Sequence, residues 1–145
     1  MKIAKKKKPS KLARQKSKPS SRYWLKQADK LWSEVVRLPG QCAICGKSEF
    51  LNAHHLIDRS VKIFRHTIIN SIPLCPKCHK YDRRLSAHKS GIVFSYWLSI
   101  NYPEKYKWVI EHYMDADIDS PNYKLAFENL QKILKDKGLK DTKKE

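Results

Sequence analysis

Two short runs, Cys42-Ala-Ile-Cys45 and Cys75-Pro-Lys-Cys78-His79, decide the fold of this chain of 145 residues. Each run places two cysteines three positions apart, so one turn of backbone can aim both sulfurs at a single point. Four thiolates satisfy the tetrahedral coordination that Zn²⁺ prefers in structural sites. The 29 residues between the pairs exceed the spacing of compact zinc ribbons. We therefore expect a four-cysteine zinc site that closes a small unit of strands and a helix.

The compartment expected for such cysteines is a reducing one, where CxxC pairs more often hold metal than form disulfides. The first 21 residues are basic and lack the apolar stretch of a secretory signal. The longest apolar stretch, residues 91–100, is far shorter than the roughly 20 residues that a membrane span needs. We therefore expect a cytoplasmic protein with no membrane partner.

The charge of the chain points to nucleic acid. The formal net charge is +17, and nine of the basic residues lie between Lys2 and Lys18, where no acidic residue occurs. A positive charge of this size favours phosphate-bearing partners because counterions are released on binding. The remainder of the chain is also basic, so the charge is not only a property of the N-terminal region.

Composition divides the chain into four parts. Residues 1–20 are expected to be a disordered basic arm, because lysines, prolines and serines dominate there. Residues 21–90 would hold an N-terminal helix and the zinc-containing core. Residues 91–138 would form a helical region that packs on this core, and residues 139–145 a frayed tail. The expected fold class is α+β.

Local patterns predict the elements within these parts. Apolar residues recur at three- and four-residue spacing in the helical segments, and prolines stand where first helical turns would begin. Trp24 and Trp32 lie on the apolar stripe of the first helix, and we expect them to pack against the zinc-bound segment. The helices are predicted at residues 21–38, 76–84 and 90–100 and from Pro103 and Pro121 onward, and the strands at residues 50–57 and 72–74.

Between and after the cysteines lie His54, His55, Asn70 and His79. Adjacent residues on a regular strand point to opposite faces, whereas at a distorted strand end both histidines could approach one phosphate. Phosphodiester hydrolysis needs a base, which a neutral imidazole supplies, and charge stabilisation, which a divalent cation supplies. The pattern therefore favours cleavage of nucleic acid over binding alone.

The segment from Cys42 to Lys80 resembles the HNH endonucleases, which have a ββα-metal fold. The cysteine pairs, the His-His pair and the run Asn70-x-x-x-Leu74-Cys75-x-x-Cys78-His79 have the spacing of that family. Within it, the chain is most similar to small phage HNH proteins and shares features with the NinG/Rap recombination endonucleases. Members of the latter group tend to carry Gly-His where this chain has His-His.

The resemblance implies a role for each matching residue. His55 would be the general base that activates water, and His54 and His79 would ligate the catalytic metal. Asn70 would brace the loop between the strands and orient His55 through hydrogen bonds. Cys42, Cys45, Cys75 and Cys78 would hold the structural zinc.

The third ligand of the catalytic metal is left open. Some family members carry a further histidine four residues after the second metal ligand, and here that position is Arg83. Water would fill the position if the ion were Mg²⁺. His88 is another candidate, although a solvent-exposed loop residue is the favoured interpretation. Mg²⁺, Mn²⁺, Ni²⁺ and Zn²⁺ all remain candidates for the catalytic ion.

The function expected from these features is metal-dependent hydrolysis of DNA phosphodiester bonds, by nicking or double-strand cleavage, in phage recombination or DNA processing. The alternatives are a zinc-containing protein that binds nucleic acid without cutting it and, on charge alone, an RNA-binding protein. Cleavage of two strands would be easiest for a dimer, and the oligomeric state is open. The expected phosphate contacts, which position a duplex without reading its sequence, are Arg59, Lys62, Arg65, Lys80, Arg83 and Arg84.

Overall fold

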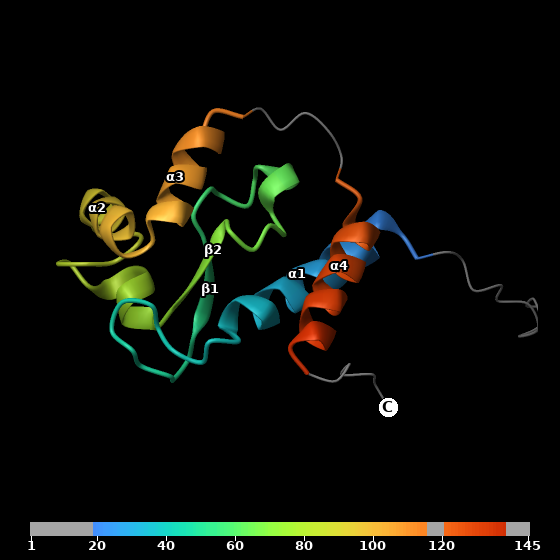
Figure 1. The fold of residues 1–145 in the computed structure, drawn as a ribbon, viewed down its shortest axis with the longest axis horizontal. Helices are drawn as coiled ribbons and strands as arrows, with labels where there is room; N and C mark the ends of the chain where they lie inside the picture. The colour runs from blue at the N-terminus through green and yellow to red at the C-terminus, as the bar shows by residue number, and fades with distance from the viewer. Residues whose placement is uncertain (1–18, 116–120, 139–145) are drawn as a thin grey trace, which may run out of the picture.

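The structure, a computed structural model, describes residues 19–115 and 121–138. The predicted arm therefore lies outside the described residues except for Pro19 and Ser20, as does the predicted tail. The chain combines helices with one small sheet, which confirms the α+β prediction (Figure 1). The elements are α1 (Ser21–Arg37), β1 (Asn52–His55), the 3₁₀ turn η1 (Lys62–Phe64), β2 (Ser71–Leu74), the π-helical turn η2 (Lys77–Tyr81), α2 (Gly91–Asn101), α3 (Pro103–His112) and α4 (Tyr123–Asp136).

Strands β1 and β2 form an antiparallel pair at the centre of the molecule (Figure 1). The register places His54 opposite Ile72 and His55 opposite Ser71. Helices α1 and α4 lie on one side of the pair, and α2 and α3 on the other (Figure 1). The two predicted active-site histidines thus sit between the two helical groups.

Two apolar clusters hold the fold together. The first surrounds the cysteines and joins β2 to Phe94 and Leu98 of α2. The second joins α1 to Leu130 of α4. Trp32 belongs to this second cluster, and Trp24 packs on Phe127 of α4 with 5.5 Å between ring centroids. The expectation that both tryptophans pack against the zinc-bound segment is therefore wrong for Trp24, which packs on α4, whereas Trp32 stacks on His55 of β1.

Two elements are shorter than predicted, for local reasons. Strand β1 begins only at Asn52 because Phe50 has a left-handed backbone (φ 52°), which cannot continue an extended strand. The helical turn after Cys75 ends at Tyr81 instead of near Arg84. Asp82 is extended there, and its carboxylate accepts a hydrogen bond from the N–H of Arg84 at 2.8 Å. This Asx turn competes with continuation of the helix.

Local residues set the starts of three helices. Ser20 accepts a hydrogen bond from the N–H of Tyr23 and caps α1, while Pro103 occupies the first turn of α3. Helix α4 begins at Tyr123 and not at Pro121 as predicted, because Asn122 caps it by accepting from the N–H of Leu125. None of the helices within residues 19–115 and 121–138 has the length and apolar character needed to cross a bilayer.

Candidate active site and metal centre

The four cysteines converge from two turns, one that precedes β1 and one that follows β2. In the first turn Gly46 adopts φ +72°, which glycine tolerates best, and its N–H donates to the carbonyl of Cys42 at 2.9 Å. All four sulfurs lie within 4.8 Å of one another, and those of Cys45 and Cys75 are 3.6 Å apart. A tetrahedral Zn²⁺ with bonds of about 2.3 Å would hold its sulfurs roughly 3.8 Å apart. The cysteine group, completed by Cys78, therefore fits a structural zinc.

Burial and hydrogen bonding act on these thiols in opposite directions. Burial raises the pKa of Cys42, but backbone N–H groups around it outweigh this effect and lower the pKa to about 7. Burial raises the pKa of Cys45 and of Cys78, and the adjacent sulfur of Cys75 adds to the rise in both. Four thiolates this close would repel one another, and a bound dication would remove that repulsion.

Three imidazoles meet beside the cysteines. His54 comes from β1, His79 from η2 and His88 from the turn before α2. The Nε2 atom of His79 lies 3.2 Å from Nδ1 of His54 and 3.1 Å from Nε2 of His88. The sequence placed His88 in an exposed loop; it is exposed, yet it also belongs to this histidine cluster.

The environment keeps the first two members of the cluster neutral. Burial lowers the pKa of His54 to about 3, and repulsion from His79 and His88 contributes. Burial also lowers the pKa of His79 to about 4, with contributions from His88 and Lys80. Both rings therefore carry an available lone pair at neutral pH, which a metal ligand requires.

His55 occupies the other side of β1, as expected for a regular strand. Its Nε2 lies 2.8 Å from the backbone carbonyl oxygen of Arg65. Because a carbonyl can only accept, Nε2 carries the proton and Nδ1 keeps the lone pair. Burial lowers the pKa of His55 below its ordinary value, so the ring is neutral at pH 7. These properties are those of a general base.

Helix α1 supports His55 in two ways. The Trp32 indole stacks on the imidazole with centroids 3.8 Å apart and planes 12° from parallel. Three positions earlier, Asp29 accepts hydrogen bonds from Nε and Nη2 of Arg65 at 2.7 and 2.8 Å, and His66 lies 2.9 Å from the same carboxylate. Because the Arg65 carbonyl holds His55, α1 positions both the face of this imidazole and its hydrogen-bond partner.

Asn70 is fully buried and ties together the loop that carries Arg65. Its Oδ1 accepts from the N–H of Ile57 at 2.6 Å, and its Nδ2 donates to the carbonyls of Ile57 and Phe64 at 3.0 and 3.1 Å. These bonds go to the loop backbone, whereas the sequence prediction had Asn70 orient His55 through hydrogen bonds. Any effect of Asn70 on His55 therefore passes through the backbone next to Arg65.

The histidines border an open cavity of 330 Å³. A neighbouring cavity of 480 Å³ shares His54, His55 and His88 and extends along α2 and α3. His54 and His55 thus face opposite sides of β1 and still border the same space. The smaller cavity is lined by Ala53, His54, His55, Asp58, Arg59, His79, Lys80 and His88.

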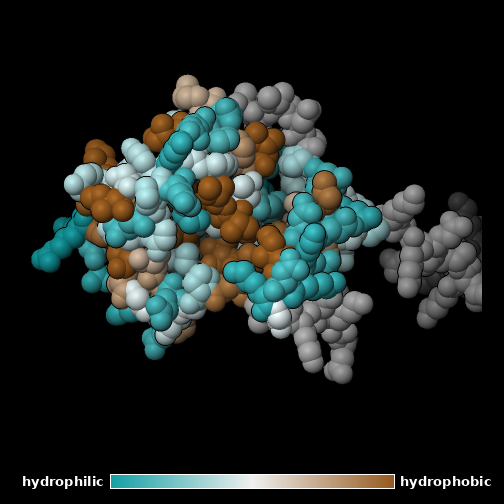
Figure 2. All heavy atoms as spheres, in the orientation of Figure 1, coloured by the Kyte–Doolittle hydropathy of each residue, from teal (hydrophilic) through white to brown (hydrophobic). Residues whose placement is uncertain are grey.

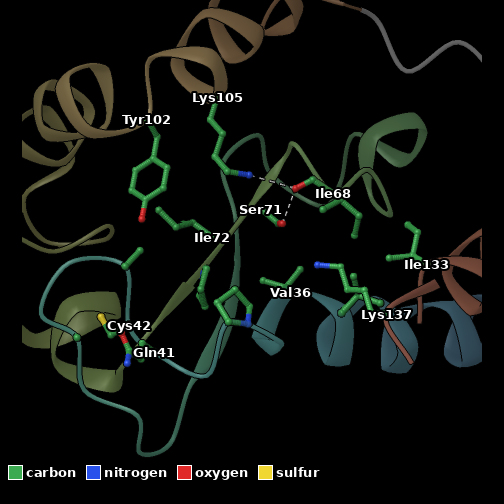
Figure 3. A pocket seen from close by; sticks show the side chains of 15 residues that line it. Val36, Gln41, Cys42, Ile68, Ser71, Ile72, Tyr102, Lys105, Ile133 and Lys137 are labelled. Atoms are coloured by element: carbon green, nitrogen blue, oxygen red, sulfur yellow. Dashed lines mark hydrogen bonds between the residues drawn. The ribbon is translucent and has the colours of Figure 1, made fainter. Parts of the chain in front are cut away.

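A further cavity, of 520 Å³, contains none of these histidines. Its lining combines residues of α1, β2 and α4 with residues of the loop around Cys42 and with Tyr102 and Lys105 (Figure 3). Apolar side chains gather at the centre of the face shown in Figure 2. Lys105 projects into the cavity, with its Nζ 3.4 and 3.3 Å from the carbonyl oxygens of Ile68 and Ile69. These contacts hold the turn just before Asn70 in place. Lys105 therefore supports the histidine site only through this turn, and no described residue that lines the 520 Å³ cavity is a candidate catalytic residue.

The six basic residues that were expected to contact DNA phosphates do not all lie at one site. Arg59 and Lys80 line the histidine cavity, and Lys62 borders a separate cavity beside α4. The guanidinium of Arg65 is engaged by the carboxylate of Asp29. Arg83 and Arg84 are exposed and follow η2 in the chain.

Three residues of the site were missed by the sequence reasoning. Asp29 and Trp32 stand three positions apart on one face of α1, and Asp29 is the first acidic residue of the chain. An acid that first appears after so many basic residues was the available signal. Asp58 follows the histidine pair by three residues and lines both histidine-containing cavities.

Comparison with known proteins agrees with this geometry over part of the chain. Residues 42–82 match the family model described as HNH endonuclease, a segment that is less than half of the chain. Neither the curated proteins nor the solved structures gave a match. The matched segment contains the cysteine group, both strands and two of the three clustered histidines. Residues 42–82 therefore carry the sequence features of an HNH endonuclease domain.

Proposed function

We propose that this chain is a metal-dependent HNH endonuclease that hydrolyses phosphodiester bonds in DNA. The observation that carries the proposal is the setting of His55. The ring is neutral, stacks on Trp32, donates to the Arg65 carbonyl and borders the cavity that also contains the three clustered histidines. The family match supports nuclease activity in general.

The proposed role of His55 is that of general base. The hydrogen bond through Nε2 leaves Nδ1 to take a proton from the water that attacks phosphorus. A positioned base of this kind contributes typically about 10²–10⁴-fold to the rate. The stack on Trp32 and the bond to Arg65 restrict ring rotation, so the lone pair keeps one direction.

His54 and His79 are the proposed protein ligands of the catalytic ion. Their nitrogens lie 3.2 Å apart, and burial keeps both rings neutral. When bound, a divalent cation would supply charge stabilisation to the scissile phosphate and to the leaving oxygen. His79 directly follows Cys78, and its N–H donates to the carbonyl of Cys75 at 2.8 Å. The cysteine turn therefore sets where this ligand stands.

Asn70 acts in this proposal as a positioning residue. It closes the loop between Ile57 and Phe64, and the residue after Phe64 supplies the carbonyl that holds His55. The resemblance implied that Asn70 braces this loop and orients His55 through hydrogen bonds, and in this proposal those bonds are the ones that Asn70 makes to the loop backbone.

DNA is the proposed partner because the cavity has positive charge beside the base. Arg59 and Lys80 line it, and Arg83 and Arg84 lie exposed one turn beyond. Such contacts would hold phosphates and fix the duplex relative to His55 without reading sequence. A phage or recombination role, the similarity to NinG/Rap, dimer formation and a cytoplasmic location stay predictions.

Plasmid cleavage tests the proposal. Wild-type protein and His55→Ala, each with its zinc content measured, are incubated with supercoiled DNA in Mg²⁺, Mn²⁺, Ni²⁺, Co²⁺ or Zn²⁺, and with structured RNA in parallel. We expect nicked or linear DNA with the wild type in at least one metal, and strong loss with His55→Ala. DNA binding without cleavage in every metal would support a non-catalytic zinc protein. Tight RNA binding with intact DNA would support an RNA-binding protein.

A further inference from the structure

His88 lies outside the segment that matches the HNH family, yet it shares the space of the two expected ligands. Its Nε2 is 3.1 Å from Nε2 of His79, and its ring centroid is 5.2 Å from that of His54. All three ligand atoms lie within 4.8 Å of one another. Around a tetrahedral ion with Zn–N bonds of about 2.0–2.1 Å, the nitrogens stand roughly 3.3 Å apart.

Hydrogen bonding alone is a poor explanation of these distances. The Nε2 atom of His79 is close to both His54 Nδ1 and His88 Nε2. A ring nitrogen has either one proton or one lone pair, so it cannot make two well-directed hydrogen bonds at once. A shared cation satisfies all three nitrogens together, because each contributes its lone pair to the same point.

The backbone holds His88 in this position. The N–H of His88 donates to the carbonyl of His79 at 3.1 Å, and the N–H of Ala87 donates to that of Cys78 at 3.0 Å. Ser86 is fully buried, and the Ser90 hydroxyl accepts from its N–H and donates to its carbonyl. The turn that carries His88 is thus built onto the cysteine turn that carries His79.

We propose that His54, His79 and His88 form a three-imidazole site that selects a borderline transition metal, such as Zn²⁺, Co²⁺ or Ni²⁺, over Mg²⁺. Imidazole nitrogen suits these ions, whereas Mg²⁺ requires oxygen ligands in near-octahedral geometry. Within the described residues this ligand group contains no carboxylate. Three protein ligands with a position open to the cavity are typical of catalytic sites for such ions. Only the catalytic use of the bound metal rests on the proposed function, because the test below measures metal binding itself.

The test is a cobalt titration of the full chain whose cysteine group is already filled with one equivalent of zinc. Co²⁺ in the histidine site should give visible d–d absorption without a thiolate-to-cobalt charge-transfer band. The variants are His88→Ala and, as a matched control, His112→Ala, whose ring contacts Trp108 in α3 instead of the cluster. Circular dichroism and zinc content check that each variant keeps its fold.

We expect His88→Ala to weaken Co²⁺ and Zn²⁺ binding at this site by at least about 10–100-fold. A loss of that size is typical when a residue that only hydrogen-bonds to a metal ligand is removed, and loss of a ligand itself should cost no less. His112→Ala should bind as the wild type does, and Mg²⁺ should not compete with Co²⁺. Unchanged affinity in folded His88→Ala, or displacement of Co²⁺ by equimolar Mg²⁺, would overturn the inference. Cobalt binding that depends on His88 without DNA cleavage would instead retain the inference and contradict the proposed function.

Discussion

Replacement of Asn70 by alanine should destabilise the protein more than its single lost amide suggests. Asn70 and Ile57 are both buried, at 0% and 3% exposure, so water cannot simply replace the missing side chain. The N–H of Ile57 would lose its partner, which costs about 1–3 kcal/mol for a buried group. The carbonyls of Ile57 and Phe64 would each lose a bond worth about 0.5–1.5 kcal/mol.

Together these losses lower the free energy of unfolding by about 3 kcal/mol, allowing for partial solvation of the Phe64 carbonyl. With a urea m-value of about 1.5–2 kcal/mol/M, the midpoint should fall by roughly 1.5–2 M. The matched control is Asn101→Ala, because Asn101 is exposed and its amide makes one bond, to the carbonyl of Trp97 at 2.9 Å. Surface changes of that kind stay within about 0.5 kcal/mol.

Urea unfolding of zinc-loaded proteins, followed by circular dichroism, measures both values, and single-turnover cleavage measures activity. Because Asn70 acts through the loop, Asn70→Ala should lose stability and activity together. A stability loss below about 1 kcal/mol, combined with an activity loss as large as that of His55→Ala, would refute this reasoning. Asn70 would then have to act on the reacting groups directly.

Three further outcomes follow from the surroundings of the site. Trp32→Leu keeps an apolar side chain in the second cluster but removes the stack on His55, so kcat should fall while KM and DNA affinity stay close to wild type in single-turnover and binding assays. Burial raises the pKa of Asp29, but the hydrogen bonds from Arg65 and His66 outweigh it and leave the pKa well below its ordinary value. A depressed carboxyl pKa gives stability that is present above the unfolded value of about 3.9 and is lost as pH falls below it. The stability difference between wild type and Asp29→Asn in urea should therefore be constant from about pH 5 to 7 and shrink below about pH 4, whereas a constant difference down to pH 3 would contradict the role of Asp29. Zinc removal by a strong chelator should abolish cooperative thermal unfolding, and Cys45→Ser should bind zinc more weakly; a chelated protein with unchanged melting would exclude a structural ion at the cysteines.

Features encoded by short spacing could be predicted from the sequence. The two CxxC runs predicted the cysteine group, and the position of His79 directly after Cys78 placed it beside that group. Pro103 predicted the start of α3 because the effect of proline on the backbone is local. The end of the turn after Cys75 was missed because the Asp82 carboxylate competes with helix continuation, which apolar periodicity does not reveal.

The support of His55 could not be predicted in the same way. Trp32 and His55 are far apart in the chain, and their stacking depends on how α1 packs across β1. The Asp29–Arg65 pair likewise spans two elements, and Arg65 alone looked like a phosphate contact. His88 has no motif spacing to either ligand, and only the pairing of its backbone with His79 brings it into the cluster. Long-range contacts thus supplied what local patterns lacked.

The most direct test of the central claim is single-turnover cleavage of supercoiled DNA by His55→Ala, with and without added imidazole. Removal of His55 leaves space between Trp32 and the Arg65 carbonyl, where a free imidazole can bind. At matched zinc content and saturating protein, we expect the rate to fall by about 10²–10⁴-fold and imidazole to restore part of it. Cleavage by His55→Ala within a few-fold of the wild-type rate would show that His55 is not the base and would contradict the account.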